Sequence, residues 1–171
     1  GTADAVADVC GAAPLDGSDL HAVLRRLIRA SLVVAHPDVP GRWTMLESIR
    51  QLAALELGTV GEADEFAATH RAWYATRVED VEGSVGLTGR PDVMSDLTAD
   101  HDNIRRAVDT AVAAGDASLA LRITAAMVPY WTSHGDWTEG HQRLGAALAM
   151  PSPDPGLRGR ALVAIGNLEL M

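Results

Sequence analysis

The chain has 171 residues, which is long enough for one domain with a buried core or for two smaller domains. Hydrophobic residues make up 47% of it, aromatic residues make up 4%, and the mean hydropathy is +0.05. This composition excludes a disordered chain and favours closely packed, Ala- and Leu-rich helices. The net charge of −9 argues against non-specific nucleic-acid binding by the chain as a whole, because phosphate binding needs a basic face.

The first part of the chain, residues 1–60, predicts the order helix, helix, strand, turn, strand, helix. Glycine and capping residues separate the two helices, and turn residues separate the two strands. This order is typical of a winged-helix unit, in which the turn is the wing. The predicted elements are a helix at Ala3–Cys10, a helix that begins at Ser18 or Asp19, strands at Ser31–Ala35 and Arg42–Met45 around a turn at Pro37–Gly41, and a helix at Glu47–Leu57.

A connecting region is expected at residues 61–93. It comprises a long helix at Glu62–Val81 and a surface loop at Gly83–Pro91, whose glycines and proline mark it as a mobile link or a domain boundary.

The last region, residues 94–171, predicts only helices. Sharp breaks at Gly115-Asp116 and Gly135-Asp136 alternate with Ala-rich helices, with an offset near the ~34–45-residue period of TPR-like repeats. The last helix has no stop signal, so we expect repeats that are truncated at the C-terminus. The predicted elements are helices at Asp96–Ala114, Ala117–Ser133 (with a kink or an end of its regular part at Pro129), Trp137–Ala149 and Leu157–Met171, with a linker at Pro151–Pro155.

The predicted fold class is therefore mainly α with a small β-hairpin, in which a winged-helix-like unit precedes TPR-like antiparallel helical repeats. Cys10 is the only cysteine, so no internal disulfide can form and a reducing cytoplasm is expected. No apolar run approaches the ~20 residues that span a bilayer, so no membrane partner is expected.

Three stretches carry a resemblance to a known family. They are Leu24–Val34, Trp43–Ala53, and Asp100–Val108 followed by Trp131, Gly135, Glu139-Gly140 and Leu148. In this order they resemble bacterial signal-transduction ATPases of the STAND, or NB-ARC-like, class. That class includes large LuxR-type regulators and the antibiotic regulatory proteins of actinobacteria. The likeness covers most of the chain.

The resemblance implies a nucleotide-binding core, then a winged-helix domain, then TPR-like repeats, and this chain looks like the last two parts. The sequence has no G-x-x-x-x-G-K-[ST] loop and no lysine at all, so ATP or ADP would bind the parent protein and no cofactor is expected in this segment. The implied partners are the nucleotide-binding domain of the same parent chain and an unknown protein or small-molecule effector. Leu46 stands where eukaryotic relatives have a nucleotide-sensing histidine, and it cannot donate a hydrogen bond.

Two sets of side chains are candidates for binding. Arg25, Arg26 and Arg29 share a predicted helix and form either a DNA-reading face or a solvated one, with the overall acidity favouring the latter. The aromatic set is either core or a partner surface, and the core is favoured. Its members are Tyr130, Trp131 and Trp137.

No catalytic residues are expected in this segment. His101, Asp102 and Asn103 are adjacent on a helix and point in different directions, so they predict structural roles. No two histidines have metal-ligand spacing with a carboxylate beside them, so no metal is expected. The alternatives to a regulatory segment of a STAND-type ATPase are a winged-helix DNA-binding repressor with a helical dimerisation tail and a TPR-type protein-binding scaffold.

Overall fold

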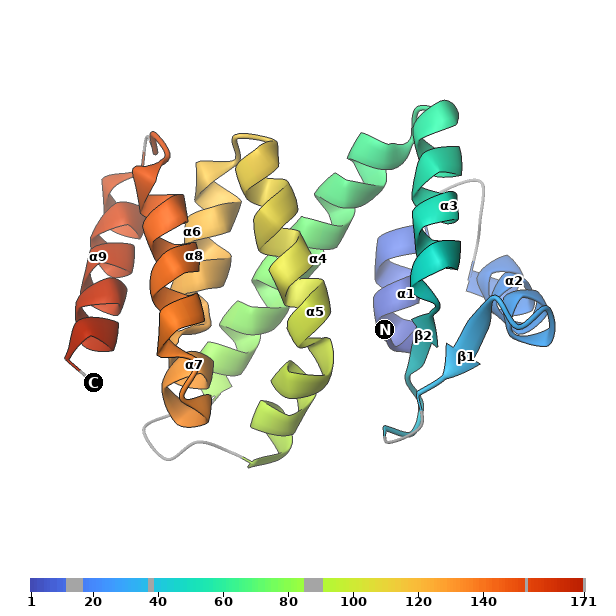
Figure 1. Cartoon of the computed structure of the whole chain (residues 1–171), viewed down its shortest axis with the longest axis horizontal. Helices are drawn as coiled ribbons and strands as arrows, with labels where there is room; N and C mark the ends of the chain where they lie inside the picture. Colours follow the sequence, from blue (N-terminus) through green and yellow to red (C-terminus); the bar gives the residue numbers. More distant parts are fainter. Residues whose placement is uncertain (12–16, 37–38, 85–90, 153, 171) are drawn as a thin grey trace. The chain divides into compact units, whose positions relative to one another are not determined.

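A computed structural model of the chain describes residues 1–11, 17–36, 39–84, 91–152 and 154–170 (Figure 1). These residues are mainly helical and include one small antiparallel sheet of two strands, as the sequence predicted. The chain divides into two compact units, Gly1–Trp73 and Tyr74–Met171. The division lies inside a long helix, α4 (Ala63–Ser84), whereas the sequence placed boundaries near residues 60 and 93. None of the described helices combines the length and apolar character needed to cross a membrane.

The first unit begins with α1 (Ala3–Cys10), where the Thr2 hydroxyl caps the helix by accepting a 3.2 Å hydrogen bond from the Ala5 amide. It continues through α2 (Gly17–Arg29), β1 (Val33–Ala35), β2 (Trp43–Met45) and α3 (Glu47–Thr59). The predicted hairpin is confirmed, with Val34 opposite Thr44 in the antiparallel register. Of the predicted wing at Pro37–Gly41, residues 37 and 38 lie outside the described part of the chain.

The helix that follows the hairpin, α3, contains no buried residue. It starts directly after β2, with the exposed Leu46 as its N-cap, so strand and helix are one continuous stretch of chain. The next helix, α4, begins in the first unit, where the Trp73 indole donates a 2.8 Å hydrogen bond to Asp8 of α1. It extends through Gly83 to Ser84, so this part of the predicted loop at Gly83–Pro91 is helical; residues 85–90 lie outside the described part.

The second unit contains the end of α4 and five further helices. These are α5 (Pro91–Ala113), α6 (Ala117–Ala126), α7 (Val128–His134), α8 (Trp137–Ala149) and α9 (Pro155–Glu169). α6 lies centrally, since it packs against α5, α8 and α9 (Figure 1). The largest fully buried side chains of the unit are Ile104, Leu121, Ile123, Met127, Trp131 and Leu144.

The helix breaks in the second unit lie where the sequence predicted them. Gly115 and Gly135 have φ angles of 73° and 75°, a left-handed conformation that glycine adopts without steric cost. The amides of Asp116 and Asp136, one residue further on, donate 2.9 Å hydrogen bonds back into the preceding helix turns, which ends each helix in the same way. The break at Pro129 is also confirmed, because α6 ends before it and α7 starts afresh with Pro129 in its first turn.

Candidate functional site: an arginine–carboxylate cluster between α5 and α8

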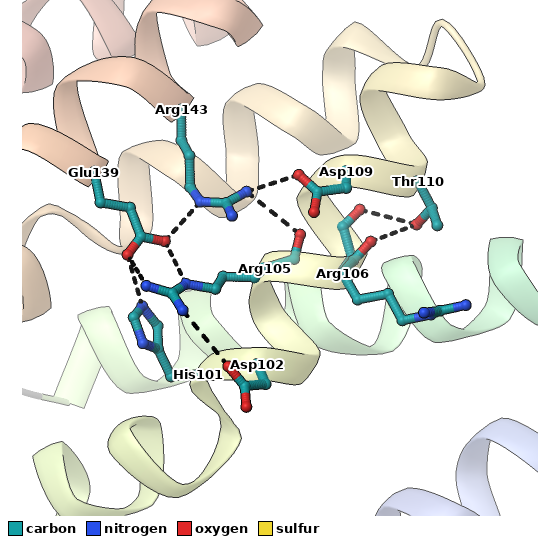
Figure 2. A network of polar contacts seen from close by, with 9 residues as sticks. His101, Asp102, Arg105, Arg106, Asp109, Thr110, Glu139 and Arg143 are labelled. Carbon is teal, nitrogen blue, oxygen red and sulfur yellow. Dashed lines mark hydrogen bonds and ion pairs between the residues drawn. The ribbon is translucent and has the colours of Figure 1, made fainter. Parts of the chain in front are cut away.

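Charged side chains from α5 and α8 meet within the second unit around one carboxylate, Glu139 (Figure 2). We call this set the Glu139 cluster. On α5, three members are spaced four residues apart and therefore share one helix face. On α8, the spacing of Glu139 and Arg143 is also four. The cluster consists of His101, Arg105 and Asp109 from α5 with Glu139 and Arg143 from α8.

Glu139 accepts hydrogen bonds from two guanidinium groups. Arg105 binds it with two donors, Nε to Oε1 over 2.7 Å and Nη2 to Oε2, in the bidentate geometry that suits a planar guanidinium. Arg143 donates from Nε to the same Oε1 over 2.6 Å. The Nη1 of Arg143 then donates to Asp109 over 2.8 Å, which connects the two helices a second time.

Most of the cluster is shielded from water. The side chains of Glu139 and Arg143 are 17% and 20% exposed, whereas those of Arg105 and Asp109 are 43% and 66% exposed and face solvent. The hydrogen bond from Arg105 is the main cause that lowers the pKa of Glu139 to about 2, and the bond from Arg143 lowers it further. The same bond raises the pKa of Arg105. Glu139 is therefore a carboxylate, and Arg105 is a cation, throughout the physiological pH range.

His101 lies at the buried end of the cluster. Its Nε2 is 3.6 Å from Glu139 and makes no hydrogen bond within the described part of the chain. Burial is the main cause that lowers the pKa of His101, and the nearby Arg105 lowers it as well. Its ring lies 5.0 Å from that of Tyr130, which stacks on His134 at 4.1 Å, so neutral imidazole fits the aromatic side of this site.

The chemistry of the cluster is that of a fixed ion-pair network. A general acid or base needs a pKa near the working pH. The pKa of Glu139 is lowered and that of Arg105 is raised, so both move away from neutral pH. Among the described residues, no group of three or more His, Cys, Asp or Glu side chains has a geometry that could hold a metal ion. The cluster therefore fixes the position of α8 on α5.

Of the candidate residues from the sequence, four belong to the first unit and three to the second. Arg25, Arg26 and Arg29 are all exposed on α2 in the first unit. Leu46 is 57% exposed at the start of α3.

The aromatic candidates divide between core and surface. Tyr130 and Trp131 are buried, at 3% and 1% exposure, so neither side chain is open to a partner in this conformation. Tyr130 borders the Glu139 cluster through its ring contact with His101. Trp137 is 42% exposed at the start of α8 and is the only one of the three aromatic candidates on the surface.

Sequence reasoning missed the central role of Glu139. The Glu139-to-Arg143 spacing is a usable signal, because a Glu four residues before an Arg forms an ion pair on a helix. No local signal pairs Glu139 with Arg105, which lies 34 residues earlier in the chain. As predicted, His101 and Asp102 diverge: His101 faces Glu139, whereas the Asp102 side chain is 96% exposed.

Comparison with known proteins identifies no relative: no protein-family model matches the chain, and no curated protein or solved structure matches it either.

Proposed function

We propose that this chain is a regulatory and interaction segment of a STAND-type ATPase transcriptional regulator. In this proposal the first unit is a winged-helix-like element that packs on the nucleotide-binding core of the same protein. The second unit is a set of TPR-like repeats that receives a protein or small-molecule effector. Effector binding would act by favouring one packing of the segment on the core over another.

The exposed surface of α3 carries the proposal. This helix has no buried residue and presents Leu52 and Leu55 at 55% and 69% exposure, with Val60, just after its last residue, at 66%. Large apolar side chains gathered on one helix are typical of an interaction surface. The preceding Leu46 is also exposed and can contribute apolar contact but no hydrogen bond, so coupling to nucleotide would depend on packing of α3.

The second unit supports the regulatory part of the proposal. Two of its helices, α5 and α7, end in Gly-Asp breaks, and successive helices pack on one another, as in helical-repeat proteins. Its principal polar cluster is an ion-pair network that joins α5 to α8. These properties suit a scaffold that transmits a rearrangement.

The proposal is tested with the nucleotide-binding core of the parent protein added to this chain as a separate domain. We expect binding that differs between the ATP and ADP states and that Leu52→Arg weakens at least about tenfold. Ala54→Arg is the matched control, since it adds the same charge at an exposed position on the other side of α3. ATP hydrolysis by the chain alone would contradict the proposal.

A second candidate is a winged-helix DNA-binding repressor, which the exposure of Arg25, Arg26 and Arg29 on one helix favours. Gel shifts at low salt distinguish the two. The repressor predicts a complex that Arg25→Ala and Arg29→Ala weaken and that Arg50→Ala on α3 leaves unchanged. The regulatory segment predicts no shift at micromolar protein.

A further inference from the structure

The C-terminal end of α3 carries a negative charge that no described residue neutralises. The free carbonyls at a helix C-terminus give that end a partial charge of about minus one half, which Arg or Lys usually complements. α3 has no basic residue in its last turn and has Glu56 there instead. Glu62 lies beside the same end, because its amide donates a 3.2 Å hydrogen bond to the Leu57 carbonyl. Both acidic residues are exposed, and neither forms an ion pair within the described part of the chain.

The other charges of α3 and α4 have local explanations. Asp64 and Glu65 lie in the first turn of α4, where the partial positive charge of the helix N-terminus stabilises a carboxylate. Arg50 is the only basic residue of α3, and it binds Glu47 in the first turn of the same helix over 2.8 Å. The negative end of α3 therefore receives no compensation from its own helix or from the start of the next one.

Exposed apolar side chains border this negative end. Leu52 lies four residues before Glu56 and Val60 four residues after it, and the backbone of Val60 keeps helical angles, so the three form one row. Leu55 lies beside Leu52 at a spacing of three residues. A partner that covers the apolar side chains therefore also removes water from Glu56. Because burying an unpaired carboxylate is costly, that partner has to supply a cation at the same place.

We infer that this end of α3 binds a basic amphipathic helix, whose apolar side chains cover those of α3 and whose Arg or Lys side chains pair with the two carboxylates. A helix fits, because side chains spaced three and four residues apart form ridges that pack into the grooves of a second helix. Under the proposed function this helix belongs to the nucleotide-binding core, so its ownership rests on that proposal. The binding surface consists of Leu52, Leu55, Glu56, Val60 and Glu62.

Fluorescence anisotropy tests the inference with a labelled helical peptide of about 18 residues that has Leu on one face and Arg on its flanks. We expect saturable binding to the whole chain, which Glu56→Gln/Glu62→Gln weakens at least about tenfold. The matched control is Asp64→Asn/Glu65→Gln, which removes the same charge from the first turn of α4 and should change the affinity less than about twofold. Equal losses in the two double variants would show attraction to the overall acidity of the chain and overturn the inference, as would an absence of binding.

Binding of the nucleotide-binding core separates failure of this inference from failure of the proposed function. Leu52→Arg and Leu52→Glu remove the same apolar contact and add charges of opposite sign. Against a basic helix, Leu52→Glu should weaken binding at least about fivefold less than Leu52→Arg does, because like charges repel. Equal losses would overturn the basic partner and leave the proposed function intact. A core that does not bind, while the peptide binds through Glu56 and Glu62, would overturn the proposed function and support the inferred chemistry of the surface. Far-UV circular dichroism confirms that each variant is folded.

Discussion

Gly140 of α8 lies so close to the indole of Trp131 that a Cβ atom at this position would be 2.8 Å from Cε3 of the ring. Trp131 is among the largest fully buried side chains of the second unit, and Leu168 of α9 approaches the same position to 3.1 Å. The missing side chain of Gly140 therefore allows α8 to pack on a tryptophan and on α9 at once.

The first prediction is that Gly140→Ala destabilises the protein by about 1–3 kcal/mol, the usual cost of overpacking a rigid core. Alanine is the better helix former by about 1 kcal/mol, so the loss would run against intrinsic propensity. Gly145→Ala, in the same helix with no atom within 4 Å of its Cβ position, should instead raise stability. Urea denaturation followed by circular dichroism measures both; a gain in stability for both variants would contradict the packing argument.

Gly140 also shows what the sequence could not predict. The helix breaks at Gly115-Asp116, Gly135-Asp136 and Pro129 were predictable, because left-handed glycine and the missing proline amide act within one turn of chain. The close approach of Gly140 to Trp131 depends on the packing of two helices, and an isolated glycine inside a helix carries no sign of it. The start of α5 at Pro91, five residues before the predicted Asp96, has a local reason, since proline is accepted in the first turn of a helix.

The second prediction concerns Glu139. Glu139→Gln removes the charge that two guanidinium groups share, and the partly buried Arg143 is left with weaker hydrogen bonds. We expect a loss of about 1–3 kcal/mol in the free energy of unfolding. The control is Asp96→Asn, which removes the charge of an ion pair with Arg77 that is more exposed than the Glu139 pairs. This variant should lose less than about 1 kcal/mol in the free energy of unfolding. Equal small losses in the two variants would show that the Glu139 cluster contributes no more than a surface ion pair.

The third prediction is the pH dependence of that contribution. The pKa of Glu139 is lowered from its ordinary value of 4.5 to about 2, mainly by the hydrogen bond from Arg105. The unfolded chain therefore binds this proton at higher pH than the folded chain does. The stabilisation is fully present above pH 4.5 and is lost as the pH falls towards 2. The difference in unfolding free energy between the protein and Glu139→Gln should shrink over this interval, and a constant difference would contradict the ion-pair account.

The fourth prediction concerns His101, whose pKa is lowered from 6.5 mainly by burial. The charged groups near it act in both directions: Arg105 lowers the pKa, and Glu139, Asp136 and Asp102 raise it. Because the folded state binds the proton less readily than the unfolded state, stability is lost as the pH falls below 6.5. An NMR titration should give an imidazole pKa below 6.5, with the resonance assigned by its absence in His101→Gln. A value above 6.5 would mean that attraction to Glu139 outweighs burial.

The last prediction separates two aspartates that look the same in the sequence. Asp116 and Asp136 each follow a left-handed glycine and precede a helix, but only Asp116 accepts a hydrogen bond from its helix, over 3.0 Å from the Leu119 amide. Asp116→Ala should therefore cost about 0.5–2 kcal/mol, the usual effect of losing an N-cap, and Asp136→Ala should cost much less. Asp116→Asn keeps the acceptor oxygen and should recover most of the loss. Chemical denaturation measures all three, and equal losses at the two aspartates would mean that the cap bond contributes nothing beyond the charge near the helix N-terminus.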